Sequence, residues 1–294
     1  MAEKNHVSSS AFHFSQYKFG LVHDQKVLKN RQPFFFATTV LVIFGCGVNC
    51  SVLLSSAPGI SSYPKGDYLA GCFGWAVRLH CVLVFSLPID NNVTLAMATW
   101  RGFAWKKVPH KPFVFIFAQL LGGFVGAALL SSRQHYTYFH AIDTFEGGVG
   151  IRTLRTAGLF SVYSIGYMTN VSAFFTELLA TAILVLVIVA LTNTNNTAPP
   201  ALFPLAIFIV MLGIGISTRI GIISFSGFAM NPARDFGPRL LTAAVGYPGS
   251  VFSFRHQYWL WNGMIAPIVG AQLAVALYDI FLCQEEDSLV LKKL

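Results

Sequence analysis

The side chains best suited to specific chemistry lie in one short run, residues 226–239. Asn231 is a favoured helix N-cap and Pro232 fits the first helical position, so we expect a helix that starts here and points the positive end of its dipole at the preceding residues. Arg234 follows Ala233, one turn into that helix, and adds a fixed cation. Together these residues predict a narrow polar lining with a positive bias.

The rest of the sequence does not favour an enzyme. Its eight histidines are scattered, and we find no Ser/His/Asp, Cys/His or metal-ligand constellation. Four of the five cysteines lie inside apolar runs, which favours packing roles over a disulfide framework or a metal site. We therefore expect neither covalent chemistry nor a cofactor.

A second short segment matches the helix that begins at Asn231. Residues 93–104 and residues 232–245 are both amphipathic, and both are too short to cross a bilayer. Taken alone, each could be an ordinary surface helix. A matching pair in corresponding halves of a chain instead points to a site at the membrane midplane between inverted repeats. We predict two half-helices.

Besides the half-helices, six apolar runs are long enough to cross a membrane as helices. They cover about residues 34–54, 68–87, 112–130, 171–191, 201–216 and 259–281. The 294 residues are 54% hydrophobic and only 11% charged, with a mean hydropathy of +0.60, which is too apolar for a soluble chain. The net charge of +8 does not indicate a nucleic-acid partner, because the basic residues gather at the ends of apolar runs.

The two halves resemble each other. The run Ala-Thr-Thr-Val-Leu-Val at residues 37–42 is similar to Ala-Thr-Ala-Ile-Leu-Val at residues 180–185. Each half holds three spans, an odd number, so the halves must cross the membrane in opposite senses. We predict an all-α membrane protein in which six transmembrane helices and two re-entrant half-helices form an inverted 3+3 repeat.

The boundaries of this channel domain follow from the apolar runs. We expect the domain at residues 32–283, with repeat one at about 32–130 and repeat two at about 171–283. Residues 1–31 and 284–294 are then tails. More Lys and Arg residues fall on the side of the tails, so we expect both termini to be cytosolic.

The run Asn231-Pro232-Ala233-Arg234-Asp235 closely resembles the major intrinsic protein family of aquaporins and aquaglyceroporins, and is most like fungal aquaglyceroporins. The resemblance covers about residues 31–283. It implies an aquaporin-like fold and a passive channel for small uncharged solutes such as glycerol, other polyols or water. It also implies a homotetramer in a lipid bilayer, and we expect that membrane to be the plasma membrane.

Matching positions in that family imply individual roles. Asn231 would be a donor at the pore centre, Arg234 the arginine of an aromatic/arginine constriction and Phe228 its aromatic neighbour. Asp235, in place of a smaller residue, resembles the glycerol type. Glu177 would brace the re-entrant loop of its own half through hydrogen bonds.

The first half departs from the family pattern. Asp90, Asn91 and Asn92 stand where the first Asn-Pro-Ala is expected. With Asp90 at the helix head, an ionised carboxylate could cap the helix but could not donate to a solute hydroxyl; a slip of one residue would put Asn91 there and restore an amide donor. The position that corresponds to Glu177 is Phe34, so the brace is also changed.

Two constriction positions have alternatives. A shortened loop in the first half selects Phe73 as the aromatic residue, whereas gapless counting selects Ala70. In the second half an insertion selects Gly215, whereas gapless counting selects Arg219, which would be repulsive beside Arg234. We favour Phe73 and Gly215.

Arg78 interrupts the second span, and no family role corresponds to it; we expect it to be paired or to face a cavity. Together with Asp90, Arg78 leaves an ion-permeable channel as an alternative function. The altered first motif leaves a second alternative, a non-conducting or gated member of the family. Gly122 and Gly126, at four-residue spacing, predict close helix contact rather than a pore lining.

Overall fold

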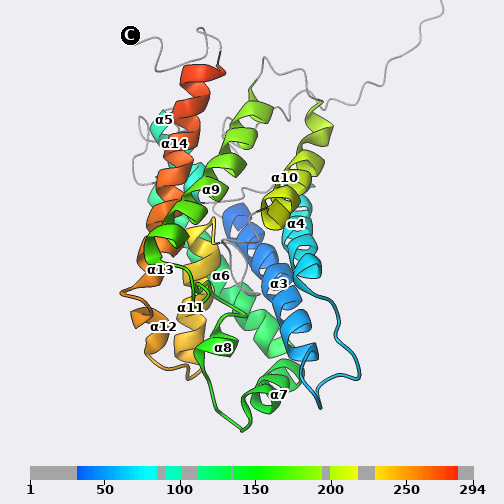
Figure 1. Cartoon of the computed structure of the whole chain (residues 1–294). Coiled ribbons are helices and arrows are strands. Elements are labelled where there is room, and N and C mark those ends of the chain that lie inside the picture. Colours follow the sequence, from blue (N-terminus) through cyan, green and yellow to red (C-terminus); the bar gives the residue numbers. More distant parts are fainter. Residues whose placement is uncertain are drawn as a thin grey trace, which may run out of the picture.

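The computed structural model describes residues 32–84, 91–100, 111–133, 135–193, 199–217 and 229–283. All regular elements within these ranges are helices (Figure 1). In chain order they are α3 (Gln32–Ser55), α4 (Tyr68–Val84), α5 (Asn91–Trp100), α6 (Lys111–Arg133), α7 (His135–Glu146), α8 (Leu154–Ala157), α9 (Asn170–Thr192), η2 (Pro200–Leu202), α10 (Phe203–Ser217), α11 (Pro232–Ala244), α12 (Ser250–Ser253), α13 (Tyr258–Leu260), the π-helical turn η3 (Trp261–Ile265) and α14 (Ala266–Phe281).

Four helices in the described ranges are long and apolar enough to cross a membrane. They are α3, most of α6, α9, and the continuous helix formed by α13, η3 and α14. Helices α4 and α10 are also apolar but shorter, with 17 and 15 residues. All six predicted spans therefore correspond to apolar helices. No charged residue interrupts α3 or α10, because a charge facing lipid would be costly.

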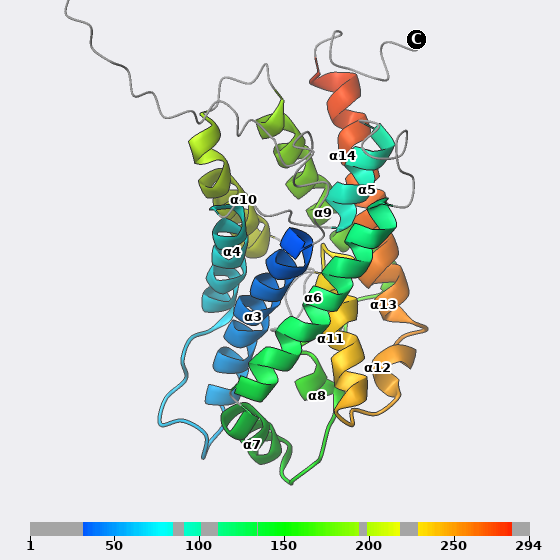
Figure 2. The same cartoon turned by 180° about the vertical axis from the view of Figure 1, so that it is seen from behind.

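The two predicted half-helices are α5 and α11. Figures 1 and 2 show α5 beside α14, toward the end of the bundle where α14 ends, and α11 beside α6 in the opposite half. Contacts agree, because α5 packs against α14 and α6, and α11 packs against α6 and η3. The half-helices thus occupy opposite halves of the bundle, as an inverted repeat requires.

Glycines let the long helices of each repeat approach closely. Helix α3 packs along α6, and α9 packs along α14. A Cβ atom at Gly126 of α6 would lie 2.6 Å from the Thr39 carbonyl oxygen of α3, and one at Gly270 of α14 would meet the Leu178 carbonyl of α9. The close contact predicted for Gly122 and Gly126 is confirmed, since a Cβ atom at Gly122 would also meet backbone of α3.

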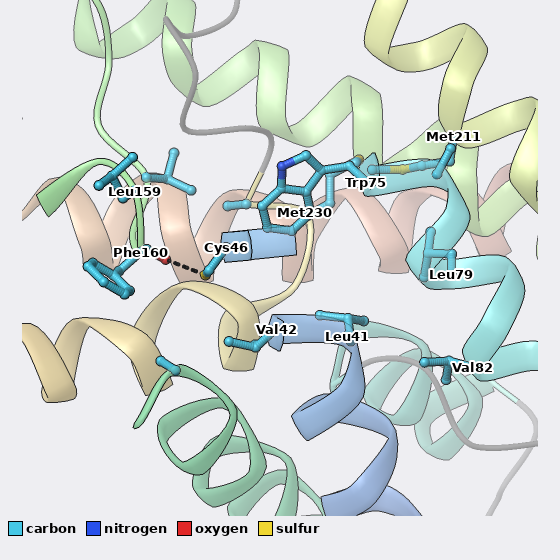
Figure 3. Packing of buried hydrophobic residues seen from close by; sticks show 14 of the residues in the cluster. Leu41, Val42, Cys46, Trp75, Leu79, Val82, Leu159, Phe160, Met211 and Met230 are labelled. Carbon is cyan, nitrogen blue, oxygen red and sulfur yellow. Dashed lines mark hydrogen bonds between the residues drawn. The ribbon is translucent and has the colours of Figure 1, made fainter. Parts of the chain in front are cut away.

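The main core lies where the two repeats meet. Helix α4 of the first repeat packs on α10 of the second, and their apolar side chains join those of α3 in one buried cluster. Figure 3 shows that this cluster also takes in Leu159 and Phe160 from the loop after α8 and Met230 from the loop before α11. Two loops therefore enter the middle of the bundle, and they position the site.

Candidate functional site

The head of α11 has the geometry that its sequence predicts. Asn231 has extended backbone (φ −148°), and its Oδ1 atom accepts a 2.9 Å hydrogen bond from the Ala233 amide. Pro232, which has no N–H to satisfy, is the first helical residue. All three residues are buried. A capped helix start thus lies inside the protein, with its positive dipole end facing the loop before it.

That loop is held by both repeats at Met230. This residue has left-handed backbone (φ 41°), which is strained for a side chain other than glycine and persists only when its surroundings hold it. Glu177 of α9 accepts hydrogen bonds from the Ala229 amide (3.0 Å) and the Met230 amide (3.1 Å). Asn92 of α5 donates from Nδ2 to the Met230 carbonyl oxygen at 2.6 Å. The hydrogen bonds expected of Glu177 are present, and Asn92 adds one from the other repeat.

The head of α5 carries two buried amides with different surroundings. Asn91 and Asn92 are the first described residues of the helix, and both are buried. Whereas Asn92 bonds to Met230, neither Oδ1 nor Nδ2 of Asn91 has a hydrogen-bond partner within the described ranges. Buried amides of this kind are costly unless water or another group satisfies them. Asp90, the alternative helix head, lies outside the described residues.

Arg234 lies against an aromatic ring from the first repeat. Its side chain is fully buried, and its guanidinium carbon is 4.1 Å from the centroid of the Trp75 ring of α4. The Trp75 Nε1–H donates to Asn49 Oδ1 of α3 at 2.9 Å, which fixes the ring. Trp75 and Arg234 thus form a cation–π pair in the bundle interior. Phe228, the predicted aromatic neighbour, lies outside the described residues.

The structure corrects the aromatic residue predicted from α4. Phe73 is 44% exposed, and its ring lies 6.3 Å from that of Phe208 in α10. Two residues further along a helix, a side chain points about 200° away, so Trp75 faces Arg234 when Phe73 faces outward. Gly215 of α10 is buried, and its carbonyl accepts a 2.7 Å hydrogen bond from the Tyr68 hydroxyl. Its alternative at position 219 is outside the described residues.

The loop after α8 ties α3 to the Trp75–Arg234 pair. Asn49 accepts from Trp75 and donates from Nδ2 to the Leu159 carbonyl at 3.2 Å. One turn earlier on α3, the Cys46 thiol donates to the Phe160 carbonyl, as the dashed line in Figure 3 marks. The Trp75 ring therefore rests on a side chain that is itself bonded to the loop.

The same loop is bonded to α11 through a buried ion pair. Asp235 and Arg239 are fully buried, and Oδ1 of the carboxylate lies 2.9 Å from the guanidinium. Asp235 also accepts from the Val162 amide, and Arg239 donates to the carbonyls of Val162 and Val251. A Cβ atom at Gly263 of η3 would lie 2.5 Å from the Asp235 carboxylate, so only glycine fits there.

Sequence reasoning gave Arg239 no partner; in the structure Arg239 neutralises Asp235 inside the protein. The four-residue spacing of the pair on a helix could have shown it. Sequence reasoning also missed the roles of Trp75, Asn49 and Met230. A tryptophan in an apolar span needs a partner for its N–H, but nothing in the sequence pattern says that the partner is Asn49.

The side chains that the structure describes at this site can bind solutes and discriminate between them. Arg234 supplies hydrogen-bond donors, and the Trp75 ring supplies an apolar face beside them. Asn91 adds an amide that can donate and accept. A polar solute with hydroxyl groups matches these surfaces, and the guanidinium charge opposes cations.

Known proteins are similar to this chain in sequence and in fold. The profile of the family described as "Major intrinsic protein" matches residues 23–278. Aquaporin-6 of Laccaria bicolor is 47% identical over 285 residues, which cover 93% of this chain and 88% of that protein. Probable aquaglyceroporin-2 of Gibberella zeae is 36% identical, with 84% of this chain and 70% of that protein covered.

Among solved structures, the X-ray structure of the aquaglyceroporin from Plasmodium falciparum superposes with a TM-score of 0.68. Sequence identity is 26%, and the match covers 86% of this chain and 96% of that one. The expected fold class is therefore confirmed. This chain belongs to the major intrinsic protein family, and it is an integral membrane channel for the passive passage of water, glycerol or both.

Proposed function

We propose that the solute path runs between the heads of α5 and α11 and past the Trp75–Arg234 pair, and that glycerol passes along it as well as water. The observation that carries this is the contact of Trp75 with Arg234, because it sets an apolar face beside hydrogen-bond donors. Glycerol has a carbon backbone on one side and hydroxyls on the other, so it can use both surfaces at once. The resemblance to an aquaglyceroporin supports the same solute class.

Each proposed pore residue has a separate task. Arg234 donates to solute hydroxyls at the narrow section, and its charge opposes cations. Asn231 and Asn91 offer amides at the two helix heads, where the positive dipole ends also oppose cations. Pro232 and Ala233 hold the shape of the α11 head, and Gly215 leaves room beside Tyr68.

The remaining sequence-based expectations enter the proposal unchanged. Phe228 is proposed near the filter, and Asp90 is the alternative to Asn91 at the head of the first half-helix. We also propose a channel domain at residues 32–283, cytosolic tails on both sides of it, a homotetrameric assembly and a plasma-membrane location. Native mass measurement in detergent tests the assembly, and a predominance of monomers would contradict it.

Solute flux into proteoliposomes tests the proposed function. Purified protein should speed water and glycerol entry in stopped-flow light scattering, relative to empty vesicles. Arg234→Ala should keep solute flux but raise proton leak by at least about tenfold, because the nearest fixed cation is removed. Arg155→Ala, which removes an arginine from the outer loop instead, is the matched control. A wild type that passes water but not glycerol would contradict the glycerol assignment.

A further inference from the structure

A groove of about 410 Å³ lies on the surface of the bundle, between the start of α9 and the turn that leads into α13. Figure 1 shows the start of α9 beside α13, and α9 also contacts η3. The apolar walls of the groove include Val171, Phe174, Phe175 and Trp261. All of these except Phe174 are more than half exposed. Because α9 and α13 belong to membrane-spanning helices, the groove opens toward lipid.

The position of the groove along α9 gives its depth in the membrane. Asn170 lines the groove and precedes Glu177 by seven residues, which corresponds to about 10 Å along a helix. Glu177 holds the loop at the head of α11, in the middle of the bundle. Each leaflet contributes about 15 Å to the hydrocarbon core of a bilayer. The groove therefore lies within one leaflet, near the level at which acyl chains join their head groups.

A fixed cation, Arg255, also lines the groove. Its guanidinium has five N–H donors, and hydrogen bonds to the carbonyls of Ile165, Gly166 and Met168 engage at most three of them. These carbonyls precede α9, so Arg255 lies at the end of the groove away from the middle of the bundle. No acid in the described part of the chain forms an ion pair with Arg255, and none of the described lining residues is acidic.

The turn that carries this cation is strained. Arg255, His256 and Gln257 all have left-handed backbone, with φ of 44°, 56° and 58°, which costs free energy in residues other than glycine. Asn170 donates from Nδ2 to the Arg255 carbonyl at 3.4 Å, which ties the turn to α9. Trp261 begins the π-helical turn η3, and such turns often occur at functional sites. Two unusual backbone features thus adjoin one groove, which favours a binding role for it.

We propose that this groove binds an anionic phospholipid of the surrounding membrane, with an acyl chain against Phe174, Phe175 and Trp261 and the phosphate beside Arg255. The charge of Arg255 selects an anionic head group, and its remaining N–H groups can donate to phosphate oxygens. A tryptophan is favoured at the level where acyl chains meet head groups. The proposal is independent of the solute path, because it requires only that the chain spans a membrane.

Fluorescence quenching tests where the lipid binds. The protein is reconstituted in phosphatidylcholine vesicles in which a minor share of the lipid is phosphatidylserine with brominated chains or, in a parallel sample, brominated phosphatidylcholine. Bromine quenches a tryptophan that it touches, and the difference between the wild type and Trp261→Phe reports on Trp261 alone. Quenching of Trp261 by the phosphatidylserine should exceed quenching by the phosphatidylcholine at least about twofold, because Arg255 enriches the anionic lipid in the groove.

Native mass measurement with added phosphatidylserine or phosphatidylcholine tests the two parts of the groove. Val171→Trp fills the apolar part and should weaken phosphatidylserine binding at least about fivefold; Val149→Trp, at a 91% exposed position between α7 and α8, is its matched control. Arg255→Gln should abolish the preference for phosphatidylserine over phosphatidylcholine. Arg155→Gln, which removes an arginine near the Phe145 ring instead, should keep that preference.

Other outcomes would overturn the proposal. Equal quenching of Trp261 by the two lipids, or wild-type phosphatidylserine binding in Val171→Trp, would show that the groove is not a lipid site. Smaller oligomers in Val171→Trp with unchanged lipid binding would assign the groove to a contact between copies of this chain. If Arg255→Gln does not fold, Val171→Trp and the quenching still decide. A wild type with no solute flux would overturn the proposed function but not the lipid site.

Discussion

The heads of the two half-helices do the same job in different ways. At α11 the bracing groups are charged: Glu177 holds the loop before the helix, and the Asp235–Arg239 pair holds the loop beside it. At α5 the anchoring group in the described part of the chain is a neutral amide, Asn92. Phe34, which occupies the position of Glu177, stacks on Phe115 of α6 with ring centroids 4.2 Å apart.

The difference teaches that the pseudo-symmetry of the fold does not extend to its polar contacts. The α5 head is hydrogen-bonded to the other repeat, because Asn92 donates to the Met230 carbonyl oxygen. Because Met230 is also held by Glu177, one carboxylate on α9 indirectly supports both heads. We therefore expect the protein to tolerate changes around α5 better than changes around α11.

The largest expected effect is at the buried ion pair. Arg239→Met leaves the Asp235 carboxylate without its cation and the Val162 and Val251 carbonyls without a donor, so the free energy of unfolding should fall by about 3–5 kcal/mol. Thermal unfolding of the purified protein in detergent measures this. Arg152→Met is the matched control, because its partner Asp143 is only partly buried. Equal losses in the two variants would show that burial of the pair does not set its contribution.

A smaller loss is expected at the brace itself. Glu177→Gln replaces one of two acceptor oxygens by an amide nitrogen, so one loop amide of Ala229 or Met230 loses its acceptor, at about 1–3 kcal/mol. Glycerol flux should fall as well, since the left-handed Met230 is no longer held on both sides. Phe34→Leu, at the matching position of the first repeat, should keep its flux. Greater flux loss in Phe34→Leu than in Glu177→Gln would reverse the comparison.

The fold could be predicted from the sequence because apolar length, the repeat and the Asn-Pro-Ala run each report on a local property. The start of α11 at Pro232, for example, follows from the cap and the proline alone. To predict the site, one would also have needed the distances between helices that are far apart in the sequence. Counting along α4 selected Phe73, but which face of that helix meets Arg234 depends on how α4 packs on α3 and α10, and this places Trp75 there instead.

The ion pairs show the same limit. The four-residue spacing of Asp235 and Arg239 on a helix suggests that they pair, but only the loop after α8, folded back onto α11, makes the pair a buried one. The carbonyls that accept from Arg239 belong to Val162 and Val251, which lie 77 and 12 residues away in the sequence. A property that depends on such returns of the chain could not be predicted from spacing along the sequence.

Two neighbouring residues of α5 sharpen the comparison further. Asn92→Ala removes the hydrogen bond to Met230 and should lower the free energy of unfolding by about 0.5–1.5 kcal/mol. Asn91→Ala removes an amide without a partner among the described residues, so stability should be unchanged or slightly higher while glycerol flux falls. Thermal unfolding and flux on both variants check this. Stability loss in Asn91→Ala with normal flux would contradict a pore role for Asn91.

The smallest expected effect concerns acid and the segment between α7 and α8. Burial alone would raise the pKa of the Asp143 carboxyl, but hydrogen bonds from Arg152 and the Gly150 amide outweigh burial, and the pKa is lowered. A carboxyl with a lowered pKa in the folded state stabilises that state above its unfolded pKa of about 3.9. The contribution is lost as the pH falls through the lower folded value.

We therefore expect the segment from Asp143 to Arg152 to loosen below about pH 4, with an effect of less than about 1 kcal/mol, because the pair is partly exposed. Amide exchange of Gly150 should show this, with protection at pH 6 reduced at pH 3. In Asp143→Asn the protection should be low at both pH values, since the neutral amide attracts Arg152 only weakly. Equal pH sensitivity in the wild type and in Asp143→Asn would mean that another acid controls the loop, with Glu146, which accepts from Thr153, as the next residue to replace.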